Sequence, residues 1–119
     1  MVIVDTSVWI DHLHSRDPQL AELLERGEVL THAIVRGELA LGRLKDRRAV
    51  LDAMARLPAA AEASSAEVEH LIENRRLFGR GLNLVDAHLL AGLLLTPEAT
   101  LWTRDKALAG VVSELSRAF

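Results

Sequence analysis

The chain alternates short apolar runs with longer stretches in which apolar residues recur at helical spacing. The short runs cover residues 2–5, 29–31 and 100–103, and their length predicts buried strands. A weaker run at residues 60–63 adds a fourth predicted strand. Continuous apolar strands that alternate with helices indicate a parallel sheet covered on both faces. We therefore expect an α/β fold with a small central parallel sheet of about four strands between layers of helices.

Residues that cap or break helices mark the ends of the longer stretches. Asp17 and Pro18 predict a helix start with the proline in the first turn, and Gly27 ends that helix. Residues 64–67 have the capping-box pattern, and Asn83 caps the helix that follows. The expected helices cover residues 7–14, 18–26, 33–41, 47–56, 64–78 and 83–95, and a last short helix begins at residue 105.

The composition is that of one globular domain, and it excludes several kinds of site. With 119 residues the chain has the size of a single domain, residues 1–119, and an apolar fraction of 50% supports a core without disulfides. The absence of cysteine excludes disulfides, thiol nucleophiles, iron–sulfur clusters and zinc sites built on Cys. A net charge of −3 argues against a purely electrostatic nucleic-acid binder. Two Trp, two Phe and no Tyr argue against an aromatic platform for stacking bases.

No segment has the pattern of a targeting signal or a membrane span. The first residues enter a strand directly, without the basic segment and apolar stretch of a signal peptide. The longest apolar run, residues 89–95, contains Gly92 and is far shorter than the roughly 20 residues of a transmembrane helix. We therefore expect a cytoplasmic protein without membrane contact.

Two acids stand at the ends of predicted strands. Asp5 follows the first strand, and Asp105 follows the strand at residues 100–103. Ligands of open α/β sheets bind outside the carboxyl ends of the strands, so these two side chains can converge there. Aspartate is also a favoured helix N-cap, which is a purely structural explanation for each acid taken alone.

Two further acids lie on the apolar sides of predicted helices. Glu38 shares its side of the helix with Ile34 and Leu41, and Asp86 shares a stripe with Leu89. A carboxylate buried there is costly unless it is paired or binds a metal. The structural alternatives are a Glu38 that reaches past the apolar edge to water and an Asp86 that interacts favourably with the helix dipole.

Asp5, Glu38, Asp86 and Asp105 thus come from four separate elements and can form one cluster. Clustered carboxylates raise one another's pKa and need a cation to stay ionised together. A donor set of oxygens alone favours Mg²⁺ or Mn²⁺ over zinc or copper. The five histidines form no His-Glu-x-x-His motif, and we expect all of them at the surface or facing a partner.

Four motifs in order along the chain carry a family resemblance. They are Val-Ile-Val-Asp-Thr-Ser-Val-Trp-Ile-Asp (2–11), Gly-Glu-Leu-Ala-Leu-Gly (37–42), Leu-Val-Asp-Ala-His-Leu-Leu-Ala (84–91) and Leu-Trp-Thr-Arg-Asp-Lys-Ala-Leu (101–108). Together they resemble the PIN-domain nucleases, in particular the VapC toxins of bacterial type II toxin–antitoxin systems. Some members carry another acid three residues after the last aspartate, where this chain has Leu108. The segment 111–119 is short, so we expect the last strand to be missing or frayed.

The resemblance implies a three-layer PIN domain and a metal-dependent endoribonuclease that a VapB-type antitoxin holds inactive. The four acids would be the catalytic residues and would hold one or two Mg²⁺ ions, with Mn²⁺ as a substitute. The metal would activate a water to attack a phosphodiester bond of RNA. Thr6 and Ser7 would orient the carboxylates, although helix capping also explains them. The expected assembly is a homodimer or a toxin–antitoxin hetero-oligomer.

The same resemblance predicts surfaces for two partners. An antitoxin arginine beside apolar anchors would fit an acidic groove, and Val8, Trp9 and Ile34 are its expected walls. Core packing is the alternative for Trp9. RNA phosphate needs cations around the acidic pocket, although a solvated surface also explains each of them. The candidates are Arg43, Lys45, Arg47, Arg48, Arg75, Arg76, Arg80, Arg104 and Lys106.

Two other functions compete with this prediction. A Mg²⁺-dependent phosphoryl-transfer domain of another α/β fold also uses acids at strand ends. Its phosphatase form requires Asp-x-Asp after the first strand, where this chain has Asp5-Thr6-Ser7. A catalytically weak PIN-fold module that only binds a partner is the other alternative, and the presence of all four acids argues against it.

Overall fold

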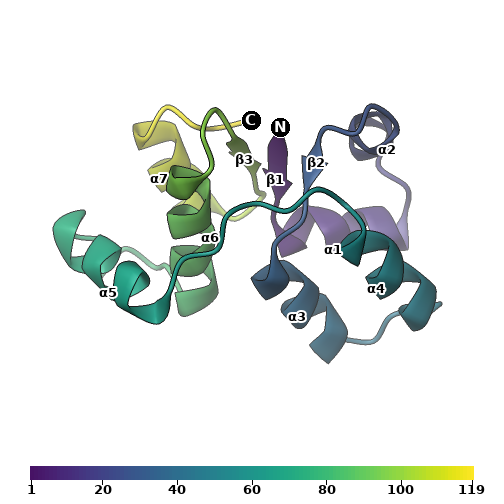
Figure 1. Ribbon diagram of the computed structural model, residues 1–119, viewed down its shortest axis with the longest axis horizontal. Coiled ribbons are helices and arrows are strands. Elements are labelled where there is room, and N and C mark those ends of the chain that lie inside the picture. Colours follow the sequence, from purple (N-terminus) through teal and green to yellow (C-terminus); the bar gives the residue numbers. More distant parts are fainter.

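Three short parallel strands form the centre of the computed structural model, which describes all 119 residues. β1 (Val2–Val4) lies between β2 (Val29–Leu30) and β3 (Thr100–Trp102), so the order is β2-β1-β3. The register pairs Val2 with Val29 and Thr100, and Ile3 with Leu30 and Leu101. Because all strands run in one direction, their carboxyl ends meet at the same edge of the sheet (Figure 1).

The sheet has fewer strands than the sequence predicts, because the segments outside β2 and β3 each form only a single bridge. The bridges pair Thr31 with Ala59 and Leu101 with Ala118. After the first bridge the amide of Ala61 donates to the hydroxyl of Thr96 instead of continuing a ladder. The strand expected at residues 60–63 is therefore wrong, and the last strand is present only as the frayed edge that the sequence predicted.

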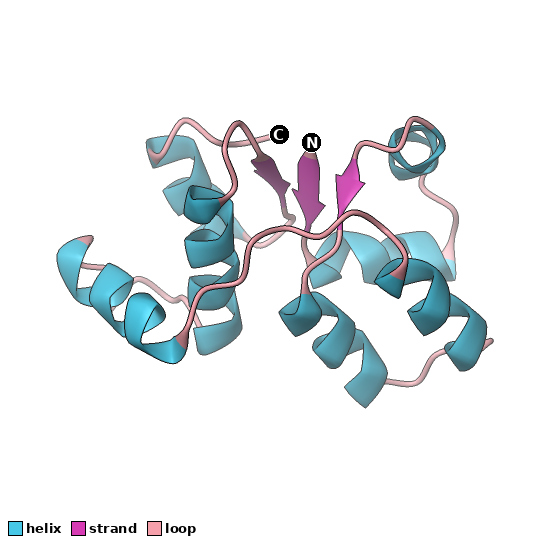
Figure 2. Ribbon diagram, viewed as in Figure 1, coloured by secondary structure: helices cyan, strands magenta, loops and turns pink.

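Seven helices flank the sheet in two groups, α1–α4 on one side and α5–α7 on the other (Figure 2). They are α1 (Thr6–His14), α2 (Pro18–Glu25), α3 (Ala33–Leu41), α4 (Arg47–Ala55), α5 (Ser65–Asn74), α6 (Leu84–Leu95) and α7 (Lys106–Glu114). The expected α/β fold with flanking helices is thus confirmed. None of these helices has the length and apolar character needed to cross a membrane.

Most helix ends follow the capping residues that the sequence shows. Ser64 and Asn83 each form a complete capping box, at the starts of α5 and α6. α5 ends four residues earlier than the expected residue 78, because Arg76 adopts a left-handed conformation with φ of 52°. A non-glycine residue in that region cannot continue a right-handed helix.

The core is one cluster of 22 buried residues around β1. Val8 and Trp9 of α1 belong to it, with exposed fractions of 0% and 5%. Their burial fixes α1 against the sheet, and it places the residues around them, Asp5 to Ser7, at the carboxyl end of β1.

Candidate active site

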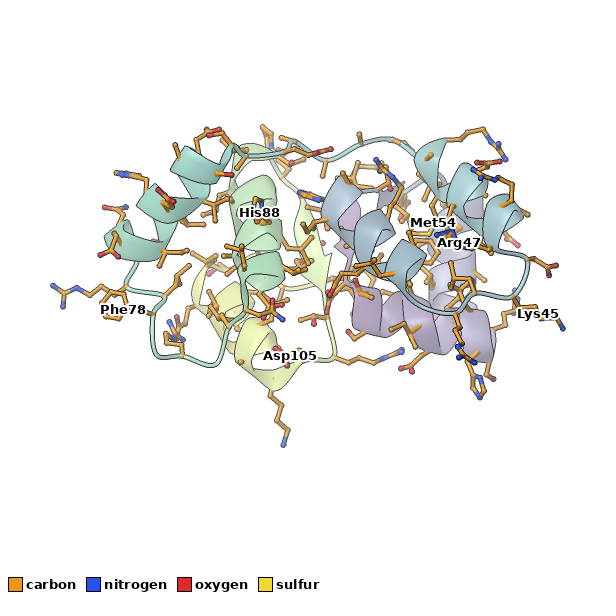
Figure 3. All side chains as sticks on the ribbon, turned by 90° about the horizontal axis from the view of Figure 1, so that it is seen from below. Lys45, Arg47, Met54, Phe78, His88 and Asp105 are labelled. Carbon is orange, nitrogen blue, oxygen red and sulfur yellow. The ribbon has the colours of Figure 1, made fainter.

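The four acids predicted from the sequence lie around the carboxyl edge of the sheet. Asp5 directly follows β1, and Asp105 precedes α7; Glu38 lies on α3 and Asp86 on α6. Figure 3 views the molecule from below this edge and labels Asp105 at the start of α7. Asp5 and Asp86 are buried, Glu38 is half-buried and Asp105 is exposed. The cluster therefore has a buried floor and an open side.

Asp5 is held by two hydroxyl groups. Ser7 Oγ donates to its Oδ2 at 2.9 Å, and Thr103 Oγ1 donates to the same oxygen at 2.7 Å. Asp5 occupies the N-cap position of α1, yet its side chain accepts no hydrogen bond from a backbone amide of that helix. Capping therefore does not explain this acid, which is 6% exposed.

Glu38 is held by a single hydroxyl across two helices. Thr6 Oγ1 of α1 donates to Glu38 Oε1 of α3 at 2.6 Å. α3 itself begins at His32, whose Nδ1 accepts the amide of Ile34 at 3.0 Å. Glu38 therefore faces the site instead of reaching past the apolar edge of α3 to water.

Asp86 combines a helix cap with a buried position among acids. Its Oδ2 accepts the amide of Asn83 at 3.0 Å, which completes the capping box of α6. Burial raises the pKa of Asp86, the hydrogen bond from Asn83 opposes this, and the charges of Asp105, Asp5 and Glu38 raise it further. The influence of all three other acids on one carboxyl shows that the four form one electrostatic cluster.

Asp105 is a helix cap that also faces solvent. Its Oδ2 accepts the amide of Leu108 at 2.9 Å at the start of α7. Leu108, three residues after Asp105, is fully buried in the core and supplies no further acid. The fourth corner of the cluster is therefore Asp105 alone.

The donor set fits a hydrated divalent cation better than an all-protein cage. All four groups are carboxylates, the ligands that Mg²⁺ and Mn²⁺ prefer. With these side-chain positions no three of them are close enough to hold one metal ion directly. Mg²⁺ usually keeps several waters and binds through one or two carboxylates, so this spacing remains compatible with it.

The structure divides the three residues expected to form the antitoxin groove. Val8 and Trp9 are core residues and offer no surface to a partner, so their expected role is wrong. Ile34 is half-buried and lines a groove beside the acids that also includes Glu38 and His88. Trp9 is buried because its ring packs in the core under α1, which was the alternative to a partner contact.

The histidines also differ from expectation at one position. His32 is only 4% exposed, so it is not the surface residue that the sequence predicted. Its Nε2 is buried without a hydrogen-bond partner, and it lies where a Cβ on Gly92 would approach to 3.0 Å. Burial lowers the pKa of His32, while the charge of Glu62 opposes that shift.

Several of the basic residues expected to attract RNA are already engaged within the chain. Arg104 pairs with Asp11 and Asp17 at 2.5 and 2.7 Å, and its guanidinium lies over the ring of Trp102. Arg80 forms a two-bond pair with Glu114. Arg47 donates to the backbone of Ala40, and Arg48 lies 3.9 Å from Asp52. The candidates without an ion pair are Arg43, Lys45, Arg47, Arg75, Arg76 and Lys106.

Thr103 is the site residue that the sequence reasoning missed. Its hydroxyl contacts Asp5, a residue 98 positions away in the chain. The available signal was a threonine that immediately follows a strand and precedes Asp105 by two residues. The ends of parallel strands bring hydroxyl groups to the same edge of the sheet, just as they bring acids there.

Comparison with known proteins gives consistent results. The family model of the PIN domain matches residues 2–113. Two proteins named Ribonuclease VapC32, from Mycobacterium tuberculosis strains CDC 1551 / Oshkosh and ATCC 25618 / H37Rv, are each 48% identical to the chain over 114 residues. The matched region covers 96% of this chain and 92% of each relative.

Proposed function

We propose that this chain, which belongs to the VapC ribonucleases of the PIN domain family, is the toxin of a toxin–antitoxin pair and hydrolyses RNA with a divalent cation. The observation that carries the proposal is the placement of Asp5, Glu38, Asp86 and Asp105 around the carboxyl edge of the sheet, on or at the start of four different helices. Helix capping accounts for the positions of Asp86 and Asp105, but it does not account for Asp5 or Glu38. A shared cation explains their convergence.

Each acid has a distinct part in the proposed mechanism. Mg²⁺, or Mn²⁺ in its place, would supply charge stabilisation and an activated water for in-line attack on the phosphodiester bond. Asp5, fixed through Oδ2 by Ser7 and Thr103, would bind the cation through its other oxygen. Asp86, buried and surrounded by acids, gains most from a bound positive charge. Glu38 and Asp105 would complete the set of carboxylates around the cation.

The RNA backbone would approach from the open side of the cluster. Carboxylates repel phosphate until a cation neutralises them, so nearby basic residues must supply attraction. Lys106 directly follows Asp105 and is exposed without an ion pair. Arg43 and Lys45 lie just beyond the end of α3, the helix that carries Glu38. These three are the proposed phosphate contacts, and Arg104 is not among them because its pairs with Asp11 and Asp17 occupy it.

A VapB-type antitoxin would inhibit the chain by occupying the groove beside Glu38. Ile34, Leu41 and Val85 give this groove apolar walls, and Glu38 and Glu62 give it negative charge. An antitoxin arginine would pair with these carboxylates while apolar residues of the same segment pack on the walls. Co-expression with the small protein encoded beside the toxin should give a stable complex without ribonuclease activity. A complex that cleaves RNA as fast as the free chain would contradict inhibition by groove occupancy.

The catalytic proposal is tested by RNA cleavage with defined metals. The purified chain should cleave RNA with Mg²⁺ or Mn²⁺ and stop when EDTA is added. Asp5→Asn should abolish cleavage, whereas Asp52→Asn, which changes an exposed acid of α4, should leave it unchanged. Full cleavage by Asp5→Asn, or cleavage that EDTA does not reduce, would contradict the proposal.

A further inference from the structure

Two hydroxyl groups meet the same oxygen of Asp5 and leave the other one free. Ser7 and Thr103 both donate to Oδ2. Oδ1 of Asp5 accepts no hydrogen bond. A fully buried Oδ1 would then be an unpartnered polar atom, and the only such atom in the chain is Nε2 of His32. Oδ1 is therefore exposed to solvent. The carboxylate therefore has one fixed oxygen and one open oxygen.

Backbone amides fix the direction of both hydrogen bonds. The amide of Arg104 donates to Ser7 Oγ at 3.2 Å, and the amide of Asp105 donates to Thr103 Oγ1 at 3.1 Å. An amide can only donate, so each hydroxyl must accept from it and keep its own proton for Asp5. Consecutive amides of the β3–α7 loop thus hold two hydroxyl groups, and both point their protons at Oδ2.

The Thr103 hydroxyl also connects two corners of the acid cluster. It touches the carboxylate of Asp5 on one side and the backbone of Asp105 on the other. The carboxylate of Asp105 is in turn fixed by the amide of Leu108. A change in the position of Asp5 would therefore be transmitted to the start of α7 through one side-chain oxygen.

We infer that Thr103 is a positioning residue, which holds Asp5 and the Asp105 loop in one arrangement with Oδ1 of Asp5 open to the cation. This inference rests on the proposed function of the acid cluster. A purely structural role would need only the bond from the Asp105 amide, which closes a local turn. The additional bond to Asp5 contributes nothing to that turn, and it distinguishes the two roles.

The decisive comparison uses three threonine variants of β3 and the loop that follows it. Thr103→Val keeps the shape and removes the hydroxyl, and Thr103→Ser keeps the hydroxyl. Thr100→Val is the matched control, because Thr100 is half-buried in β3 and its side chain makes no hydrogen bond. Circular dichroism checks folding, and Thr103→Ala replaces Thr103→Val if the valine variant does not fold.

Mn²⁺ affinity, measured from the electron paramagnetic resonance of free Mn²⁺, is the readout that needs no RNA. Loss of a group that orients a metal ligand typically weakens metal binding about 10- to 100-fold. Thr103→Val should therefore bind Mn²⁺ at least about tenfold more weakly than the wild type, and Thr103→Ser and Thr100→Val should bind nearly as the wild type does. In RNA cleavage at saturating Mn²⁺, kcat should fall in Thr103→Val with little change in KM.

Three results would overturn the inference. They are wild-type Mn²⁺ affinity in Thr103→Val, failure of serine to restore affinity, and absence of Mn²⁺ binding by the wild-type chain. A wild-type chain that binds Mn²⁺ without cleaving RNA would contradict the proposed function instead. The Mn²⁺ comparison among the variants would still decide the role of Thr103.

Discussion

The two halves of the acid cluster are held in different ways. On the α1 and α3 side, Asp5 and Glu38 accept hydrogen bonds from side-chain hydroxyls. On the α6 and α7 side, Asp86 and Asp105 accept hydrogen bonds from backbone amides at the starts of their helices. Every helix start offers free amides, whereas a hydroxyl must be placed by a particular residue. The second half therefore combines site chemistry with helix stability, and the first half depends on added side chains.

This difference predicts that all four acids matter equally for cleavage and unequally for stability. Asp5→Asn, Glu38→Gln, Asp86→Asn and Asp105→Asn should each lower kcat/KM at least about 100-fold, the upper end of the loss seen when a group supporting a metal ligand is removed. Because the four act as one unit, Asp5→Asn combined with Asp86→Asn should be little worse than either alone. Steady-state RNA cleavage measures this. Multiplied losses in the double variant would mean that the two halves act independently.

The largest difference in stability should appear at Asp105. Asp105→Ala removes the cap of α7 and should lower the free energy of unfolding by about 1 kcal/mol. Asp105→Ser restores a capping oxygen, so it should recover the stability and leave the chain inactive. Asp5→Asn should change stability little, because the Asp5 side chain makes no capping hydrogen bond to α1. Urea unfolding of these variants would refute the comparison if Asp5→Asn lost as much stability as Asp105→Ala.

Replacing Asp86 should stabilise the chain, whereas replacing Asp105 should destabilise it. Its pKa is raised in the folded state, first by burial and then by Asp105, Asp5 and Glu38. A raised pKa means that stability is full below the unfolded-state pKa and is lost as pH rises through the folded-state value. Asp86→Asn should therefore stabilise the chain at pH 7, by less than Asp105→Ala destabilises it, and this gain should vanish towards pH 4. Melting temperatures across that range measure it, and a gain independent of pH would exclude charge as its cause.

The smallest predicted effect concerns the start of α3. The pKa of His32 is lowered, chiefly by burial, with Glu62 opposing and with His88 and Arg36 adding to the shift. A lowered pKa gives stability that is present above the unfolded-state value of about 6.5 and lost as pH falls through the folded-state value. His32→Asn keeps a capping oxygen but removes the titrating imidazole. The stability of this variant should therefore change less than that of the wild type between pH 7.5 and 5.5. Equal changes in both would show that other groups cause the acid sensitivity.

The sequence predicted the sheet centre and the meeting of the acids because both follow from local patterns. Residues 2–5 and 100–103 combine an apolar strand with a chemical group at its end, and parallel strands bring such ends together. Local patterns could not predict the loss of the strand at residues 60–63, since Ala61 bonds to Thr96, a residue 35 positions away. They also failed for Trp9 and His32, whose burial depends on packing across the whole fold.

The role of Thr103 in the site could not be predicted from local patterns either. A threonine at a strand end suits a turn, a cap or a site equally well, and the choice is made by Asp5 at the far end of the chain. Acids on apolar surfaces are conspicuous because burying a charge is costly. Hydroxyl groups incur little such cost, and their partners become visible only in three dimensions.

The central claim is that the four acids share a divalent cation, and anomalous diffraction from a Mn²⁺-soaked crystal tests it most directly. We expect a Mn²⁺ peak at the carboxyl edge of the sheet, in contact with Asp5 and with at least one of Glu38, Asp86 and Asp105. The same soak of Asp5→Asn should show a much weaker peak. A crystal soaked at a Mn²⁺ concentration that supports RNA cleavage, with no peak among these carboxylates, would contradict the account.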